Sequence, residues 1–358
     1  MTDSSPAAAT DTVLVTGATG FIAQHCMLQL LEAGYRVRGT ARSASRTAEV
    51  ADVLRPHLSD AGRAGLADRF EVVAADLTAD AGWDEAVAGC RYVLHVASPI
   101  PRTPPKNPDE LIVPARDGAL RVLRAASSAG VERVVLTSSV AAVLYGRDRD
   151  RVFTEDDWSN IDDKRIGTYE KSKAIAERAA WDAMGELGSE STMSLAVINP
   201  GLVLGPLLSS DWGTSGEAVK KLIDRDFPAI PDIHYACVDV RDVAAAHVAA
   251  MTAPGAAGQR FICAEADHSL REIASILAAH LGPKGFKVPT GKLPGPVLKM
   301  VALWDKTAQL ALNDLGVRQD IDNAKIRRVL GWQPRGLEEM VVSMADSMIE
   351  HGIVKAGK

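Results

Sequence analysis

Short β-rich runs alternate with helical patterns through the first two hundred residues of this chain. The β-rich runs lie at 12–17, 35–41, 70–76, 91–98, 132–139 and 193–200. Helical patterns lie between them, at 21–32, 48–55, 83–88, 109–129 and 169–187. Strands that alternate with helices in this way pair in parallel and need helices on both faces of their sheet. The chain therefore predicts an α/β fold built on a doubly wound parallel sheet.

The first β-rich run leads directly into TGATGFIA, residues 16–23. Gly17 and Gly20 permit a tight turn and let main-chain amides approach a pyrophosphate, and the helix that begins there offers its positive end. A turn used only for packing is the alternative, but the place at the first strand–helix junction favours nucleotide binding. The sequence therefore predicts a Rossmann-type domain. The cofactor contacts expected in this turn are Thr16, Gly17, Thr19, Gly20, Phe21 and Ile22.

The alternation breaks down after Pro200. Residues 202–216 predict a loop, and helical patterns follow at 217–225 and from 270 onward. One β-rich run at 260–264 is expected to rejoin the sheet. A chain of 358 residues is long enough for a second lobe. We expect a disordered lead-in over 1–11, a Rossmann domain over 12–200 with a return near 236–264, and a smaller, mostly helical C-terminal substrate lobe over 201–235 and 265–358.

The residues after the second strand bear on the choice between NAD and NADP. An NAD site places an acid there to bind the ribose 2′-hydroxyl. This chain has GTARS at 39–43 and no Asp or Glu until Glu49. Arg42 is therefore expected to pair with a 2′-phosphate, with help from Ser43, Arg46 or Arg38. The alternative is that Arg42 is a solvated surface charge, and NADP(H) is the predicted cofactor.

The ends of the third and fourth strands border the same crevice. Asp76 lies where an adenine edge is expected, although it could instead cap the following turn. Ala97 is small enough to let a cofactor approach, whereas His95 is expected to be a hydrogen-bonded core histidine rather than a catalyst. The cofactor contacts expected at these ends are Asp76, Leu77, Val96, Ala97 and Ser98.

Tyr169 and Lys173 stand four residues apart in a helical pattern, so they share one helix face. A free phenol titrates near pH ~10. An ammonium about 4 Å away at an effective dielectric of ~20 interacts by about 4 kcal/mol, which bounds a fall of about three units in the tyrosine pKa. The alternative is a surface tyrosine packed on a lysine stem.

Hydroxyl side chains also follow the fifth strand, on Thr137, Ser138 and Ser139. Open α/β sheets hold their ligands at this end of the strands, although such residues are also common as caps.

The order of these features resembles the extended form of the short-chain dehydrogenase/reductase superfamily, over roughly residues 12–345. More narrowly, it is similar to the branch of dihydroflavonol reductase, cinnamoyl-CoA reductase and related aldehyde and ketone reductases. The glycine turn departs from the common pattern at Ala23, which replaces a third glycine. The stretches that carry the resemblance are GYRVRGTARSASR (34–46), EDDWSN (155–160), TYEKSKAIAERAAWD (168–182), INPGLVLGP (198–206), VDVRDVAAAHVAAM (238–251) and RRVLGWQPRGLEEMV (327–341).

The resemblance implies roles for individual residues. Ser139 would polarise a carbonyl, Tyr169 would donate the proton, and Lys173 would hold the nicotinamide ribose and lower the tyrosine pKa. The remaining cofactor contacts that we expect are Thr137, Pro200, Gly201, Leu202 and Val203, the last four beside the nicotinamide. The expected activity is a reversible, NADPH-dependent reduction of an aldehyde or ketone. The alternatives are an NAD-dependent nucleotide-sugar epimerase or dehydratase, which Arg42 disfavours, and an NADP-binding sensor without turnover.

Composition narrows the partners and the location. Charged residues make up 24% of the chain, the net charge is −6 and there is no block of Lys and Arg, which argues against nucleic acid. The chain contains no run of eighteen apolar residues, so no membrane span is predicted. The four cysteines are too far apart in the sequence to have the spacing of a metal site. We expect a cytoplasmic monomer or homodimer acting on a small apolar or aromatic carbonyl compound. The segments expected to line its substrate site are Pro99–Pro105, Val143–Tyr145, Leu204–Trp212 and Phe227–Tyr235.

Overall fold

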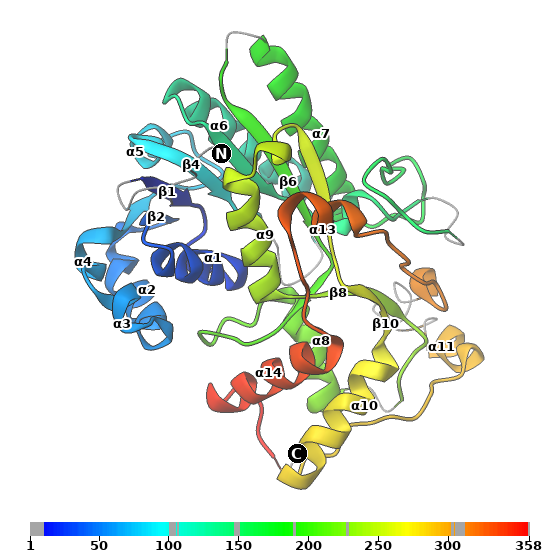
Figure 1. Cartoon of the computed structure of the whole chain (residues 1–358). Coiled ribbons are helices and arrows are strands. Elements are labelled where there is room, and N and C mark those ends of the chain that lie inside the picture. Colours follow the sequence, from blue (N-terminus) through cyan, green and yellow to red (C-terminus); the bar gives the residue numbers. More distant parts are fainter. Residues whose placement is uncertain are drawn as a thin grey trace.

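A seven-stranded parallel sheet forms the centre of the N-terminal part of the chain (Figure 1). The computed structural model describes residues 11–99, 105, 107–146, 151–188, 191–226, 229–301, 304 and 312–356. Of the expected lead-in, residues 1–10 lie outside the described residues. In sheet order, the strands are β3 (Phe70–Ala74), β2 (Arg36–Ala41), β1 (Thr12–Val15), β4 (Cys90–His95), β5 (Arg133–Thr137), β6 (Ser194–Pro200) and β9 (Gln259–Cys263).

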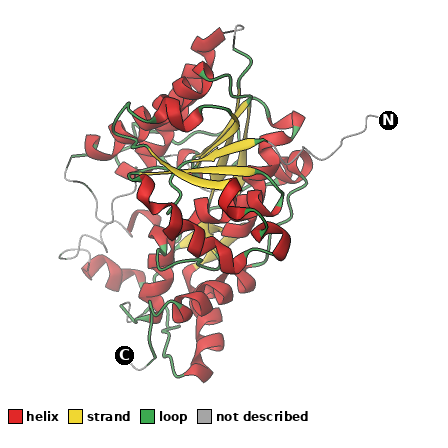
Figure 2. Cartoon of the chain, turned by 90° about the vertical axis from the view of Figure 1, so that its left-hand side faces the viewer, coloured by secondary structure: helices red, strands yellow, loops and turns green. Residues whose placement is uncertain are grey.

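Helices cover both faces of this sheet (Figure 2). One face packs against α1 (Phe21–Glu32) and α9 (Val240–Thr252), because alternate strand residues such as Val13 and Val15 point toward them. The other face packs against the helices on the opposite side, through residues such as Leu14 and Val93. These helices are α5 (Trp83–Val87), α6 (Asp109–Ser128) and α7 (Thr168–Leu187). The predicted doubly wound fold is confirmed. Short helices α2 (Thr47–Leu54), α3 (Asp60–Arg63) and α4 (Leu66–Arg69) lie between β2 and β3.

The C-terminal part contains a second sheet that the sequence did not predict. Its order is β10 (Ala266–Ser269), β8 (His234–Asp239) and β7 (Leu202–Leu204). The stretch expected to be a loop over 202–216 thus begins with a strand and ends inside a helix. Gly201 makes this possible, because a Cβ atom there would lie 1.9 Å from the Ala236 carbonyl oxygen. The helices of this part are α8 (Gly213–Ile223), α10 (Leu270–Leu281), α11 (Gly295–Val301), α13 (Ala324–Leu330) and α14 (Leu337–Glu350).

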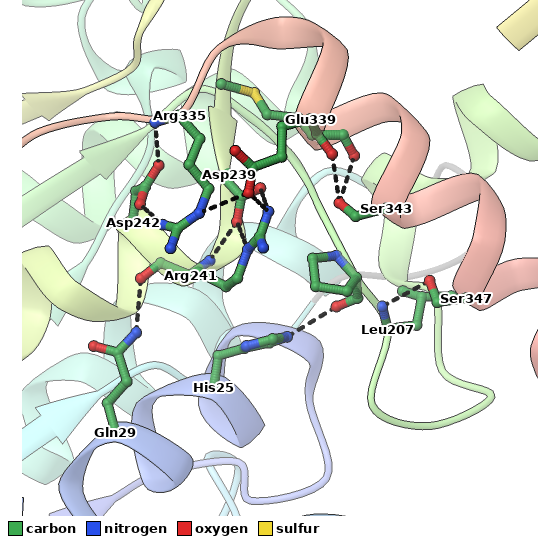
Figure 3. Close-up of polar contacts among 12 residues, drawn as sticks. His25, Gln29, Leu207, Asp239, Arg241, Asp242, Arg335, Glu339, Ser343 and Ser347 are labelled. Atoms are coloured by element: carbon green, nitrogen blue, oxygen red, sulfur yellow. Dashed lines mark hydrogen bonds and ion pairs between the residues drawn. The ribbon is translucent and has the colours of Figure 1, made fainter. Parts of the chain in front are cut away.

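Polar side chains on α1 join the two parts of the molecule (Figure 3). His25 Nε2 donates to the Pro206 carbonyl at 2.9 Å, and Gln29 donates to the Arg241 carbonyl at 2.7 Å. Burial lowers the pKa of His25 to about 4, so the ring is a neutral donor at physiological pH. These bonds hold the helix that follows the glycine turn against the chain that leads into the C-terminal part.

Ion pairs extend this junction from α9 to α14 (Figure 3). Arg335 pairs with the buried Asp242, and its N–H donates to the same carboxylate at 2.7 Å. Arg241 pairs with Asp239 at 2.7 Å and with Glu339 of α14 at 3.0 Å. The junction is therefore specified by charge as well as by apolar packing. Across the described part of the chain, the helices are all too short or too polar to span a membrane.

Candidate active site

The turn between β1 and α1 is shaped for the close approach of an anion. Gly17 has a φ of +73°, and a Cβ atom there would lie 3.1 Å from the Cβ of Ala97. The Gly20 N–H donates to the Gly17 carbonyl at 2.8 Å, which closes the turn. Gly20 is the N-cap of α1, and among the described residues no side chain caps this helix. The first amides of α1 therefore face outward without a capping group, which fits the pyrophosphate of a dinucleotide.

Side chains near this turn stabilise it from behind. Thr40 Oγ1 accepts the Gly17 N–H at 3.1 Å, and the Thr19 carbonyl accepts a bond from Gln24 at 3.1 Å. Phe21 is buried and packs edge-on against His25, with ring centroids 5.8 Å apart. The side chain of Phe21 thus belongs to the core, and any contact with a cofactor falls to its main chain.

The Thr16 hydroxyl joins the ends of β1 and β4. It accepts the Ala97 N–H at 2.9 Å and is hydrogen-bonded to Nδ1 of His95 at 2.8 Å. Burial, with a smaller effect of the Lys173 charge, lowers the pKa of His95 to about 3. His95 is therefore neutral near pH 7. The expectation of a buried, hydrogen-bonded histidine is confirmed.

The arginines near the end of β2 have different environments. Arg42 is exposed, and among the described side chains no carboxylate pairs with it, although its charge lowers the pKa of Asp76. Arg46 pairs with Glu49, through Nε at 2.9 Å and also through Nη2. Arg38 cannot assist, because it pairs with Glu71 at 2.6 Å and donates to three main-chain carbonyls around α5. Of the three arginines, Arg42 is therefore the best placed to bind a 2′-phosphate. Arg46 could contact the same phosphate only if its ion pair with Glu49 were broken or shared.

Asp76 and Leu77 follow β3 in a local turn. Asp76 Oδ1 accepts the Thr78 N–H at 2.8 Å and the Thr78 hydroxyl at 2.7 Å, and these bonds lower the Asp76 pKa. The turn-capping alternative is therefore realised, with the second carboxylate oxygen still available for other bonds. Leu77 packs against α6, since a Cβ atom on Gly118 would lie 3.0 Å from its side chain. Both residues shape the crevice wall beyond β3.

Ser139, Tyr169 and Lys173 come together at the carboxyl end of the sheet. Tyr169 lies in the first turn of α7, and Lys173 Nζ lies 5.8 Å from the centroid of its ring. Lys173 also donates to Ser98 Oγ, beyond β4, at 3.1 Å. Ser139 caps the short 3₁₀ helix Val140–Ala142, and its hydroxyl is near enough to Tyr169 to lower the pKa of the phenol. The structure thus brings the three expected catalytic side chains to one point beside the glycine turn.

Burial controls the protonation of this group. It raises the pKa of Tyr169, against the lowering effect of the Ser139 hydroxyl, while the Glu170 charge raises it further. It lowers the pKa of Lys173 to about 8, against the raising effect of Glu177. The expected lowering of the tyrosine pKa by Lys173 is therefore wrong for this structure. Both charged forms lose hydration in the buried site, and the loss outweighs the attraction at this separation.

The side chains after β5 and β6 face different directions. Thr137 Oγ1 lies 2.6 Å from Nε2 of His247 in α9, so its hydroxyl is engaged within the core rather than left for a cofactor. The Pro200 carbonyl lies 3.4 Å from Ser139 Oγ. Gly201 donates to the Cys263 carbonyl at 3.2 Å, and Leu202 and Val203 continue into β7. The expected contact between Thr137 and a cofactor therefore remains a prediction, with its hydroxyl already hydrogen-bonded to His247.

The segments expected to line a substrate site are less open than their sequences suggest. Val143, Leu144, Leu207 and Leu208 are buried among other apolar side chains. Three aromatic residues of these segments stay partly exposed, namely Tyr145, Trp212 and Tyr235. Residues 100–104 and 227–228 of the expected lining lie outside the described residues.

One buried residue next to the predicted catalytic group, Glu177, was not predicted from the sequence. Glu177 is fully buried one turn after Lys173 in α7. The spacing of four residues that joins Tyr169 to Lys173 continues to Glu177, which places a carboxylate on the same helix face. That continuation, Tyr-x-x-x-Lys-x-x-x-Glu, was the available signal.

Comparisons with known proteins agree with this geometry. The family model described as "NAD dependent epimerase/dehydratase family" matches residues 13–264. Cinnamoyl-CoA reductase 1 of Arabidopsis thaliana is 38% identical over 271 residues, which cover 75% of this chain and 74% of that protein. Tetraketide alpha-pyrone reductase 1 of the same plant is 32% identical over 349 residues, covering 95% and 96%. The solved structure of yeast methylglyoxal/isovaleraldehyde reductase Gre2 complexed with NADPH aligns with a TM-score of 0.77 at 28% identity, over 96% of this chain and 100% of that one.

Proposed function

Because the chain belongs to the NAD dependent epimerase/dehydratase family, we propose that it is an NADPH-dependent reductase of aldehydes or ketones. The observation that carries this proposal is the convergence of Ser139, Tyr169 and Lys173 beside an uncapped helix N-terminus. Similarity to cinnamoyl-CoA reductase and to the NADPH-bound aldehyde reductase supports it. The reaction is a reduction of a carbonyl group to an alcohol and runs in reverse through the same groups.

The cofactor site follows from the residues around the glycine turn. The amides of the first turn of α1 would hold the pyrophosphate, since no side chain among the described residues caps this helix. Arg42 pairs with the 2′-phosphate, since no acid occupies the end of β2. Lys173, whose ammonium donates to Ser98, would bind the nicotinamide ribose. When bound, NADPH supplies the hydride that the protein itself cannot provide.

Proton delivery rests on Tyr169, whose side chain is half-buried. Ser139 donates a hydrogen bond to the substrate carbonyl oxygen, which orients the carbonyl beside the Tyr169 phenol. Burial raises the Tyr169 pKa, so the phenol is protonated at neutral pH and remains the donor form. Lys173, whose pKa is about 8, is mostly an ammonium at pH 7 and stabilises the tyrosinate that remains after proton transfer. The partly exposed Tyr145, Trp212 and Tyr235 favour an aromatic or apolar substrate.

The test is NADPH consumption, with NADH alongside, against a panel of aromatic and aliphatic aldehydes and ketones and one nucleotide sugar. Wild type is expected to prefer NADPH, and Tyr169→Phe is expected to lose about 10²-fold or more in kcat. Tyr92→Phe is the matched control, because Tyr92 also has a raised pKa but is buried on β4 opposite Val13 of β1. Turnover of the nucleotide sugar alone, or a fully active Tyr169→Phe variant, contradicts the proposal.

A further inference from the structure

A buried carboxylate lies directly behind the proposed catalytic group. Glu177 is fully buried, one helical turn beyond Lys173 on α7. Burying a carboxylate is costly unless donors surround it. Three side chains donate hydrogen bonds to it here, and a fourth, Arg260, pairs with it as a positive charge.

These side chains come from β6, from β9, from the residue that follows β5, and from α7 itself. Ser138 Oγ donates to Oε2 of Glu177 at 2.6 Å, and Asn199 Nδ2 donates to the same atom at 2.7 Å. Arg260 of β9 pairs with Oε1 at 2.7 Å, and Trp181 donates to Oε1 at 3.4 Å. Glu177 therefore connects the carboxyl ends of β5 and β6 and the first residues of β9 to the helix that carries Tyr169 and Lys173.

Two of these contacts lead directly to Ser139. Ser138 is its neighbour in the chain, and Asn199 Nδ2 also donates to the Ser139 carbonyl at 3.1 Å. The main chain at Ser139 is thus held from two sides through one carboxylate. A shift of this carboxylate would move the Ser139 hydroxyl, which acts on the pKa of Tyr169.

Arg260 is itself held in place. Its Nη1 donates to the carbonyls of Glu155 at 3.1 Å and Asp157 at 2.7 Å, and its guanidinium lies 3.8 Å above the Trp158 ring. The positive charge of Arg260 therefore cannot move toward or away from Glu177 easily. It offsets part of the Glu177 charge that Lys173 experiences.

The other titratable groups near Lys173 are neutral, are paired with other residues, or act on other groups, so they do not supply the negative charge that Glu177 supplies. At the end of β4, His95 is neutral near pH 7. On α6, which packs along α7, Arg116 pairs with Asp117 and Arg121 pairs with Asp80. On α7 the charge of Glu170 acts on Tyr169. Beyond β9, Glu155 has a pKa raised by burial and accepts the Ile262 N–H at 3.1 Å.

We propose that Glu177 is a positioning residue, whose buried carboxylate holds Ser139 in place and keeps the side chain of Lys173 charged, with Arg260 limiting that effect. The part that concerns catalysis rests on the proposed reductase function. The part that concerns the charge of Lys173 rests on the placement of both buried side chains one turn apart on α7 and does not depend on the proposed function.

Two substitutions are expected to move the Lys173 pKa in opposite directions. Glu177→Gln removes the negative charge, so the Lys173 pKa falls from about 8 by about one unit, the size expected for a charge one helical turn away. Arg260→Gln removes a positive charge, so the Lys173 pKa rises. Glu177→Asp keeps the charge and is expected to restore most of the wild-type value.

The experiment follows the carbon-13 resonance of the Lys173 Cε through a pH titration, assigned by its loss in Lys173→Arg, together with the pH profile of kcat/KM. Opposite shifts of the resonance midpoint in Glu177→Gln and Arg260→Gln are the expected result, with the kcat/KM profile moving alongside. Unchanged midpoints, or shifts in the same direction, overturn the proposal even if activity falls. If Glu177→Gln does not fold, the rise in Arg260→Gln and the recovery in Glu177→Asp decide the question. Correct shifts in a protein that reduces no carbonyl would refute the proposed function and leave the charge effect standing.

Discussion

Replacing Glu49 by Gln is expected to tighten NADPH binding. Glu49 pairs with Arg46 at the end of the segment that we assign to the 2′-phosphate. The two side chains are 57% and 42% exposed, so the pair contributes only about 0–1 kcal/mol to stability. A phosphate that recruits Arg46 must first displace this carboxylate and then tolerate its charge nearby. Without the carboxylate, Arg46 is free to join Arg42.

The size of the effect follows from the exposure of the pair. Up to about 1 kcal/mol corresponds to an NADPH Kd that is lower by about two- to fivefold, with the NADH Kd unchanged. The gain shrinks as salt rises, because the Debye length falls from about 10 Å at 0.1 M to about 3 Å at 1 M. Loss of an acid from the first turn of α2 lowers stability by about 0.3–1 kcal/mol, which thermal unfolding reports separately.

Fluorescence titration with NADPH and NADH at two salt concentrations measures this change. Asp52→Asn is the matched control, because Asp52 also lies on α2 and faces Arg55 at the same spacing of three residues, at 4.0 Å. That variant is expected to leave both affinities unchanged. Equal changes for the two cofactors, or a tighter NADPH complex in Asp52→Asn as well, would refute the assignment of this segment to the phosphate.

Three further substitutions test the turn, the catalytic lysine and the junction. Gly17→Ala is expected to lose about 1–2 kcal/mol in urea unfolding because of its left-handed backbone, and to lose NADPH binding because its Cβ meets Ala97; unchanged affinity would contradict the anion site. Lys173→Met is expected to be more stable than wild type by about 3 kcal/mol below pH 8, because the folded state holds the Lys173 proton less tightly than the unfolded state. This advantage disappears as pH rises from about 8 to 10.5, and a difference independent of pH would refute the burial argument. Arg335→Ala leaves the buried Asp242 unpaired and is expected to cost about 3 kcal/mol, whereas an unchanged urea midpoint would mean that the junction does not depend on this pair.

The large sheet was predictable because each of its strands carries a local signal. Val13 to Val15, for example, form a continuous apolar run that ends at a glycine turn, which is typical of a strand buried on both faces. The strand Leu202–Leu204 has only three residues and borders glycines on both sides, so its pattern is that of a loop. Its pairing with β8 depends on the close approach at Gly201, a contact between segments far apart in the chain.

In the candidate site, too, features set by the local sequence were predictable, and features set by distant segments were not. Tyr169 and Lys173 were identifiable because a spacing of four residues is set by the helix alone. Arg38 was a plausible phosphate ligand in the sequence, but its direction depends on Glu71 in the neighbouring strand. The Thr137 hydroxyl is likewise taken by His247, more than a hundred residues away. Directions of side chains on strands depend on which elements cover each face, and that information is not local.

The direction of the tyrosine pKa shift shows why electrostatics is harder still to infer from spacing. Coulomb attraction between Tyr169 and Lys173 follows from their positions on one helix, but the cost of dehydrating each charge follows from everything packed around them. Here that cost raises the Tyr169 pKa and lowers the Lys173 pKa, so each residue is driven toward its neutral form. The Lys173 pKa of about 8 already includes the raising effect of Glu177, so a site with only Tyr169 and Lys173 would lose its ammonium below pH 8. By our proposal, Glu177 thus extends upward the pH range in which the predicted pair can work, and its burial is a property that the sequence pattern alone does not give.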